Sequence, residues 1–530
     1  MSQSRRRFLN LSGMAVITAT TGCDRLPGAL LGDQFAKGTE RPFHPPRSDT
    51  IDLITHHLNR LSFGPRPGDY DRVRALGATE EEAVEAYIEE QLHPERISDQ
   101  VCERAVSRLP ALAEPLGELF EYHDHVLLRE LVHGTLLRAV YSQRQLYEVM
   151  IQFWSDHFNI DPSKGDCKWL KVWDDREVIR RYALGYLPTA PPPGLPEILR
   201  RFVPGAAPHA PRPAGKFSDL VRASALSPAM LWYLDGRENR KSLPDDLPNE
   251  NYARELLELH TLGVHGGYRQ NDVTEVARAL TGWTVRGLRR SSLNFQVGKV
   301  EFNPDLHDDG PKTVLGKLIP AGGGADDLDR VLQIVSAHPS TASHVARKLC
   351  QRFIADPPPD SAVATAAQAF LKSQGGIRET LRALFHSEEF RAARGLKFKR
   401  PFNFVVSALR ATDARVRRRP NPYDDGPIYE YLRRMGHAPF DYPTPDGYPE
   451  QADPWFGTLL WRWKFALALS RNALRETDVD FSSLKRRAQG EEPLMALFLG
   501  RKPTLEEVEA CRASGDTLAL LLASPAFQKC

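Results

Sequence analysis

Apolar residues recur with the period of an α-helix along most of the chain beyond residue 50. Over residues 136–158, Leu146, Val149, Met150 and Phe153 share one face, with His157 one turn further along it. The same period predicts helices over residues 251–262, 272–280, 341–354, 377–385, 403–411 and 455–469. We therefore expect a mainly α-helical fold, in which residues 51–528 form one large multi-helix domain.

Two segments depart from this period. Residues 294–302 and 312–319 alternate apolar and polar positions and are rich in β-forming residues, which predicts a small β-hairpin or sheet flap near 294–319. Residues 188–213 are dense in proline, which lacks an amide donor and breaks helices. This block predicts an exposed insertion in a helical connection.

The N-terminus carries an address motif. Residues 4–9 read Ser-Arg-Arg-Arg-Phe-Leu, and a weakly apolar stretch without acidic residues follows over 11–21. An arginine pair before a short apolar segment is typical of a twin-arginine export signal, predicted here over 1–22 and followed by a flexible tether over 23–50. The alternative is a basic, frayed end of a cytoplasmic protein.

Cys23 follows Gly22, as at a lipoprotein processing site, although Thr20 stands where Leu is usual. A lipid on Cys23 would tether the protein to a membrane surface. We expect a periplasmic or cell-envelope protein whose membrane contact is limited to that anchor.

Charge narrows the class of partner. The 530 residues include 70 Lys and Arg and 68 Asp and Glu, for a net charge of +2. Residues 1–22 hold three Arg and no acid, so the mature chain carries +2 − 3 = −1. This balance disfavours binding to nucleic acid.

The densest run of polar side chains covers residues 249–260. Glu250, Arg254 and Glu258 are spaced as an i, i+4, i+8 charge ladder, while Glu255 lies on an adjacent stripe and His260 precedes a glycine turn. Carboxylates and a histidine at such a turn suit a divalent metal or an acid–base pair. A salt-bridged structural helix with a capped histidine is the alternative.

Two further candidates stand elsewhere in the chain. His157 lies beside Trp154 and Phe158, where a histidine is more often a hydrogen-bonded core residue than a ligand. His307 and Asp308 lie in the loop 302–312, where they could supply a ligand or a general base, or belong to a solvated turn. The chain has no H-E-x-x-H and no G-x-S-x-G motif.

Several long motifs resemble the bacterial domain-of-unknown-function family 1800 (DUF1800) over residues 51–528. They are His57-Leu-Asn-Arg-Leu-Ser-Phe-Gly-Pro65, Phe153-Trp-x-x-His-Phe-Asn159, the segment Asn249–Val264, Ala279–Thr284, His307-Asp308 with Lys312-x-x-Leu-Gly316, and Pro443-x-Pro-x-Gly-Tyr-Pro449. The resemblance implies a large, exported, mostly helical protein. It also implies a gene neighbour, an exported protein of the domain-of-unknown-function family 1501 (DUF1501), which resembles sulfatases.

The resemblance brings no established activity. It marks seven sites of interest, His157, Asn251, Arg254, Glu255, His260, His307 and Asp308. Two hypotheses follow. One is an accessory protein that binds the neighbouring DUF1501 protein, for which a large exposed apolar patch is expected. The other is a metal- or cofactor-dependent periplasmic enzyme, with His260, Glu255, Arg254, His307 and Asp308 as catalytic residues and His157, His260 and Glu255 as ligands of a divalent metal.

Overall fold

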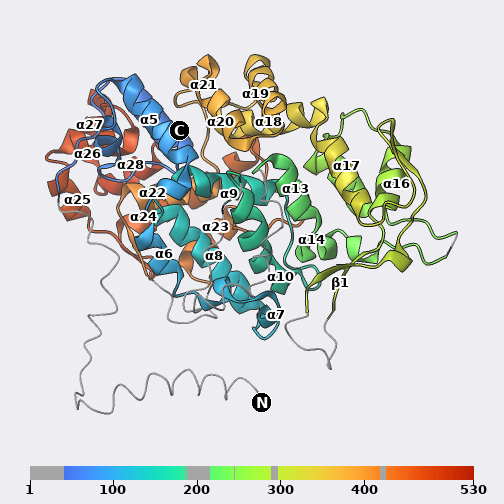
Figure 1. Ribbon diagram of the computed structural model, residues 1–530. Coiled ribbons are helices and arrows are strands. Elements are labelled where there is room, and N and C mark those ends of the chain that lie inside the picture. Colours follow the sequence, from blue (N-terminus) through green and yellow to red (C-terminus); the bar gives the residue numbers. More distant parts are fainter. Residues whose placement is uncertain (1–40, 186, 188–214, 244, 288–296, 418–424) are drawn as a thin grey trace, which may run out of the picture. The chain divides into compact units, whose positions relative to one another are not determined.

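The computed structural model describes residues 41–185, 187, 215–243, 245–287, 297–417 and 425–530 (Figure 1). The predicted signal peptide, Cys23, residues 23–40 of the predicted tether and the Pro-rich block 188–213 lie outside them, as do residues 294–296 of the predicted flap. No helix within the described ranges has the length and apolar character needed to cross a membrane.

Helices dominate these residues, which confirms the predicted mainly α-helical class. The first part of the chain contains α3 (Leu53–Leu61), α4 (Asp69–Arg74), α5 (Glu80–Leu92), η1 (Pro94–Arg96), α6 (Gln100–Val106), η2 (Pro110–Ala113), α7 (Leu116–Leu119), α8 (Asp124–Tyr141), α9 (Gln145–His157), α10 (Cys167–Asp174), the π-helical turn η3 (Asp175–Ile179) and α11 (Arg180–Tyr182).

The middle contains α13 (Phe217–Ala225), α14 (Pro228–Tyr233), η4 (Gly236–Glu238), α15 (Asn251–Glu255), the π-helical turn η5 (Leu256–His260), α16 (Gln270–Ala279), η7 (Pro304–Leu306), α17 (Asp326–Ser336), α18 (Pro339–Phe353), α19 (Asp360–Lys372), α20 (Ile377–Phe385) and α21 (Glu388–Ala392). The last part contains α22 (Pro401–Ala411), α23 (Pro427–Arg434), η8 (Asp453–Thr458), α24 (Leu459–Ser470), α25 (Phe481–Arg487), α26 (Glu491–Leu499), α27 (Leu505–Ala513) and α28 (Thr517–Ala523).

The helix predicted over 136–158 is broken between α8 and α9. The hydroxyl of Ser142 donates to Asp99 at 2.7 Å and accepts the amide of Arg144 at 3.0 Å. The side-chain amide of Gln145 donates to the carbonyls of Ala139 and Ser142 at 3.1 and 2.8 Å. These side chains bond backbone groups that a continuous helix would pair with one another, so the chain turns here.

The predicted β-structure is present, but its strands pair differently from a single hairpin over 294–319. Strand β2 (Val300–Phe302) pairs antiparallel with β1 (Trp283–Val285), and β3 (Lys312–Val314) pairs antiparallel with β4 (Lys317–Ile319). Leu315 and Gly316 between β3 and β4 both have positive φ, as a tight hairpin turn requires. A further pair joins β5 (Arg415–Val416) to β6 (Thr477–Asp478).

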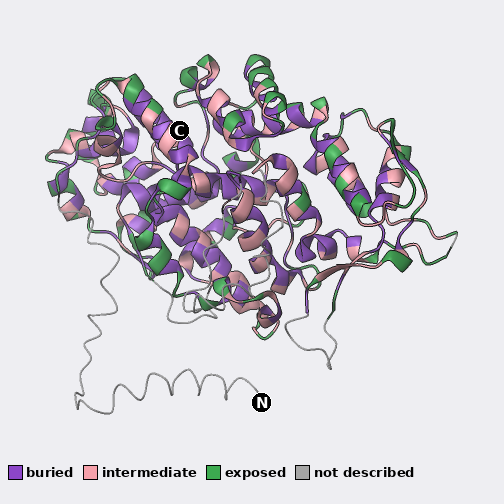
Figure 2. Cartoon of the chain, in the orientation of Figure 1, coloured by how far each residue is buried: buried purple, intermediate pink, exposed green. Residues whose placement is uncertain are grey.

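Residues Arg41–Cys530 form one compact unit. Its core is rich in aromatic side chains, and Trp154 contacts Phe158 and Phe217 at ring-centroid distances of 6.0 and 5.7 Å. Buried and exposed positions alternate around outer helices such as α5, α17 and α19 (Figure 2). The five described cysteines are free, and four of them are buried.

Candidate functional site

Three histidines meet where the polar helix ends. His260 closes η5, His157 closes α9 and His344 lies on α18. The ring of His157 lies 6.2 Å from that of His260 and 6.1 Å from that of His344. The sequence analysis named His157 and His260, and the structure brings these two together and adds His344.

The backbone explains why these histidines are here. A helix leaves its last carbonyls without partners inside the helix. At the end of η5, Nε2 of His157 lies 3.1 Å from the carbonyl oxygen of His260, and Nε2 of His344 lies 3.1 Å from that of Leu259. Thr261 and Gly263 donate to the carbonyls of Leu256 and Leu257. His157 and His344 therefore cap the helix end.

Gly263 permits this close packing. Its φ is +81°, and a Cβ added there would lie 2.8 Å from Nδ1 of His344. A larger residue would combine backbone strain with a clash against the capping ring. The glycine turn that follows the polar helix thus serves the helix end.

Burial keeps the cluster uncharged. Desolvation, with Lys348 nearby, lowers the pKa of His260 to about 3 and that of His344 to about 4, and it lowers the pKa of His157 well below its usual value. Neither ring nitrogen of His260 has a hydrogen-bond partner among the described residues. A neutral imidazole of this kind can ligate a metal, but the described chain brings no three His, Cys, Asp or Glu side chains into a metal-holding group.

Glu255, the third member of the predicted ligand set, belongs to a different surface. It is half-buried, and burial together with Glu258 and Asp446 raises its pKa. Arg254 forms the predicted ladder, 3.2 Å from Glu250 and 3.6 Å from Glu258. Nδ2 of Asn251 lies 3.2 Å from the carbonyl oxygen of Leu234. Arg254 and Asn251 thus hold α15 to its surroundings.

His307 and Asp308 belong to a separate buried network beside the flap. Asp308 accepts two bonds from the Arg278 guanidinium, at 2.9 and 3.0 Å, and this pairing contributes to a pKa well below the usual range despite burial of the carboxyl. Nδ1 of His307 lies 2.9 Å from the carbonyl oxygen of Thr281, and its Nε2 lies 3.4 Å from Asp327.

Lys312 completes that network. Its ammonium lies 2.6 Å from the Asp327 carboxylate, and both side chains are fully buried. Lys312 also donates to the carbonyls of Asp308 and Gly310. The loop 302–312 is therefore folded around internal charges, and none of the partners named for it belongs to the three-histidine cluster.

A different kind of surface lies on η8 and α24. Phe456, Leu460, Trp463 and Leu467 are spaced by four, three and four residues, so they share one helical face. Their exposed fractions are 52%, 56%, 49% and 39%. The opposite face buries Arg462, Phe465, Ala466 and Leu469 against the core, chiefly toward α28. We call the four exposed residues the α24 stripe.

The sequence analysis predicted a helix here but did not single out the stripe. A signal was present, because residues 459–467 are apolar on both faces of the helix. A helix that is hydrophobic all round is usually buried, which makes an outer face of this composition informative only once the structure shows it exposed.

The comparisons with known proteins give a family. The family model described as "Protein of unknown function (DUF1800)" matches residues 56–529, nearly the whole described chain. The chain therefore belongs to this family. Neither the curated proteins nor the solved structures gave a match.

Proposed function

We propose that this member of the DUF1800 family is an exported accessory protein that binds a neighbouring exported protein, of the sulfatase-like DUF1501 family, through the α24 stripe. The observation that carries the proposal is the stripe itself. Four large apolar side chains follow one another along a single helical face and remain exposed. Contiguous apolar surface of this kind is rare on monomers and marks interaction sites.

The composition of the stripe suits a protein partner. Trp is among the residues that dominate binding energy at interfaces, especially when apolar neighbours exclude water around it. Each large apolar side chain that becomes fully buried contributes roughly 1.5–3 kcal/mol before the costs of association. A helix face lying in an apolar groove is a recurring recognition mode.

The rim adds a charge preference. The cationic groups of Lys464 and Arg434 lie over the Trp461 ring, 4.5 and 4.6 Å from its centroid. Lys464 is exposed beside the stripe. We therefore infer that the partner surface is an apolar groove with acidic residues at its edge, and that association slows as salt is added.

The polar clusters support the same proposal indirectly. His157 and His344 cap a helix end, while His307, Asp308 and Lys312 hold a loop. These side chains have structural work inside the fold, whereas the exposed faces of Leu460 and Trp463 have no comparable internal role.

The test is a titration of the purified chain with the DUF1501 protein encoded beside it. Trp463→Glu and Leu460→Glu each place a charge in the interface and should raise Kd at least about 30-fold, which corresponds to about 2 kcal/mol. Leu505→Glu is the matched control, because Leu505 lies on α27 and is 83% exposed. It should bind like the wild type.

Two results would overturn the proposal. One is a wild-type chain that does not bind the DUF1501 protein. The other is Trp463→Glu binding as tightly as Leu505→Glu. Sedimentation of the chain alone completes the test, because a dimer that Trp463→Glu converts to a monomer would assign the stripe to a second copy of the chain instead.

A further inference from the structure

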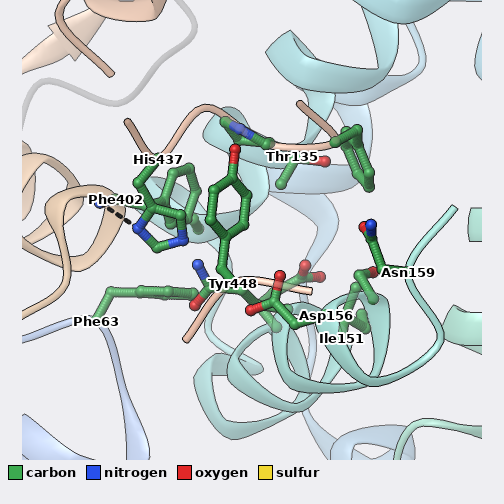
Figure 3. A pocket seen from close by; sticks show the side chains of 14 residues that line it. Phe63, Thr135, Ile151, Asp156, Asn159, Phe402, His437 and Tyr448 are labelled. Atoms are coloured by element: carbon green, nitrogen blue, oxygen red, sulfur yellow. Dashed lines mark hydrogen bonds between the residues drawn. The ribbon is translucent and has the colours of Figure 1, made fainter. Parts of the chain in front are cut away.

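A pocket lies along α9, on a part of that helix that the three-histidine cluster does not use (Figure 3). Its empty volume is about 530 Å³, including the mouth. Phe63, Phe402, Phe440 and Tyr448 supply aromatic walls. Asp156 and Asn159 reach it from the end of α9 and lie near Tyr448 in Figure 3.

Two hydroxyl groups in the pocket wall lack partners. Oγ1 of Thr135 and Oγ of Ser155 are buried and have no hydrogen bond among the described residues. A buried polar group without a partner costs free energy, and nearly all such groups in folded proteins are satisfied by protein, water or ligand. Two in one wall point to a ligand that completes them.

His437 contributes a donor. Its Nδ1 accepts the backbone amide of Phe402 at 3.2 Å, so the proton of the neutral ring resides on Nε2. Burial, together with Arg400 and Arg352, lowers the pKa of His437 well below its usual value and keeps the ring neutral. An Nε2–H donor therefore belongs to the lining of the pocket.

Asn159 contributes an acceptor of fixed orientation. Its Nδ2 donates to the carbonyls of Tyr442 and Thr444, at 2.9 and 2.8 Å. This pairing commits the amide nitrogen to the loop beyond α9 and leaves Oδ1 to accept. The pocket thus combines hydroxyls that both donate and accept with one fixed donor and one fixed acceptor.

The charges in the wall are compensated. Asp156 is 2.8 Å from Arg400, and Glu148 accepts two bonds of 3.0 Å from Arg180. A charged ligand would have to lose its hydration without gaining an unpaired counter-charge. The lining therefore favours an uncharged ligand.

We propose that this pocket binds a neutral sugar unit. A sugar ring is uncharged, carries hydroxyls around its edge that can both donate and accept, and has apolar C–H faces that pack on aromatic rings. Sites for small ligands are mostly apolar with a few placed polar groups, which is the composition found here. The inference goes beyond partner binding and does not depend on the α24 stripe.

The test is saturation-transfer NMR of the purified chain with glucose, galactose, mannose and cellobiose, followed by titration of each sugar that binds. At least one neutral sugar should bind. Glucuronic acid, which adds a carboxylate, should bind more weakly than glucose. Thr135→Val and Ser155→Ala each remove one unpartnered hydroxyl and should weaken sugar binding roughly 3- to 10-fold.

A thermal readout separates binding from folding. Because these hydroxyls have no partner in the fold, Thr135→Val and Ser155→Ala should leave the melting temperature equal to or above that of the wild type. Ser336→Ala is the matched control, since Oγ of Ser336 is also buried and unpartnered but lies on α17, outside the pocket lining. It should not change sugar affinity.

Three results would overturn the sugar site. The first is that no neutral sugar binds, including the case in which the aromatic probe p-nitrophenol does. The second is that both hydroxyl variants bind sugar as the wild type does. The third is that they lower the melting temperature while sugar affinity is unchanged, which would assign the hydroxyls to the fold.

Discussion

The end of the polar helix and the outer face of α24 use their side chains in opposite ways. At η5, residue types typical of catalysis are turned inward, where His157 and His344 cap backbone carbonyls. On α24, residue types typical of a core are turned outward, and Leu460 and Trp463 are about half exposed. Chemical reactivity alone would rank these two regions in the reverse order of their availability.

The difference teaches that availability decides function. A titratable group whose hydrogen bonds are spent on the fold contributes mainly to stability. An apolar group left in water has free energy to gain from a partner. Four predictions, ordered from the largest effect on stability to none, can break or sharpen this comparison.

The largest effect is expected at the flap network. Lys312→Met removes the ammonium that pairs with fully buried Asp327 and leaves an uncompensated charge. Loss of one partner of a buried pair typically costs about 3–5 kcal/mol. Calorimetric melting should show this loss, while Lys317→Met, an exposed lysine in the same hairpin, should melt like the wild type. Equal melting of the two variants would contradict a structural role.

The second effect depends on pH. Burial lowers the pKa of His260 to about 3 and of His344 to about 4, against an unfolded value near 6.5. A lowered folded pKa means that protons bind the unfolded chain more tightly, so stability is full above pH 6.5 and falls as pH drops toward 4. Melting curves from pH 7 to 4 measure the slope.

His260→Phe should make that slope shallower, because it removes one of the buried groups that must be protonated. His265→Phe is the control, since His265 is exposed in the same segment. It should retain the wild-type slope. A His260→Phe slope as steep as the wild type would place the acid sensitivity elsewhere.

A smaller effect is expected at Glu255, and it opposes the loss of stability that a salt-bridged helix would suggest. Burial, Glu258 and Asp446 raise its pKa, so its charge destabilises the fold once pH exceeds that pKa. Glu255→Gln should therefore raise the melting temperature slightly at pH 7, with no gain at pH 4.

Glu250 provides a control of opposite sign, since hydrogen bonds, chiefly from Thr274, lower its pKa despite some burial. Glu250→Gln should lower the melting temperature at pH 7. The same sign of change in both variants would contradict this electrostatic account.

No change in stability is expected on the α24 stripe. Trp463→Glu alters an exposed side chain and should shift the free energy of unfolding by no more than about 0.5 kcal/mol. Phe465→Ala, two residues away on the buried face, should cost about 3–5 kcal/mol. Calorimetry of the pair tests whether the stripe is free of the fold, and a large loss in Trp463→Glu would place it in the core.

Much of the fold could be predicted from the sequence because its signals are local. Helical period gave α16, α18, α20 and α22 to within a few residues. The break after Tyr141 and the pairing of β2 with β1 depend on contacts between distant residues, such as Ser142 with Asp99. Periodicity does not carry that information.

The candidate site was predictable only in part. The motifs indicated that His157 and His260 matter, and the structure places them in contact. Their capping role depends on the π-helical turn that ends at His260, which no local pattern marks. The exposure of Trp463 depends on which face α28 covers, a property of the whole fold.

Photo-crosslinking in the producing cell tests the central claim most directly. A benzophenone amino acid is placed at position 463, or at position 505 as the control, and the products are identified by mass spectrometry. The account predicts a crosslink to the neighbouring DUF1501 protein from position 463 and none from 505. Crosslinks from 463 only to a second copy of the chain, or equally from both positions, would contradict it.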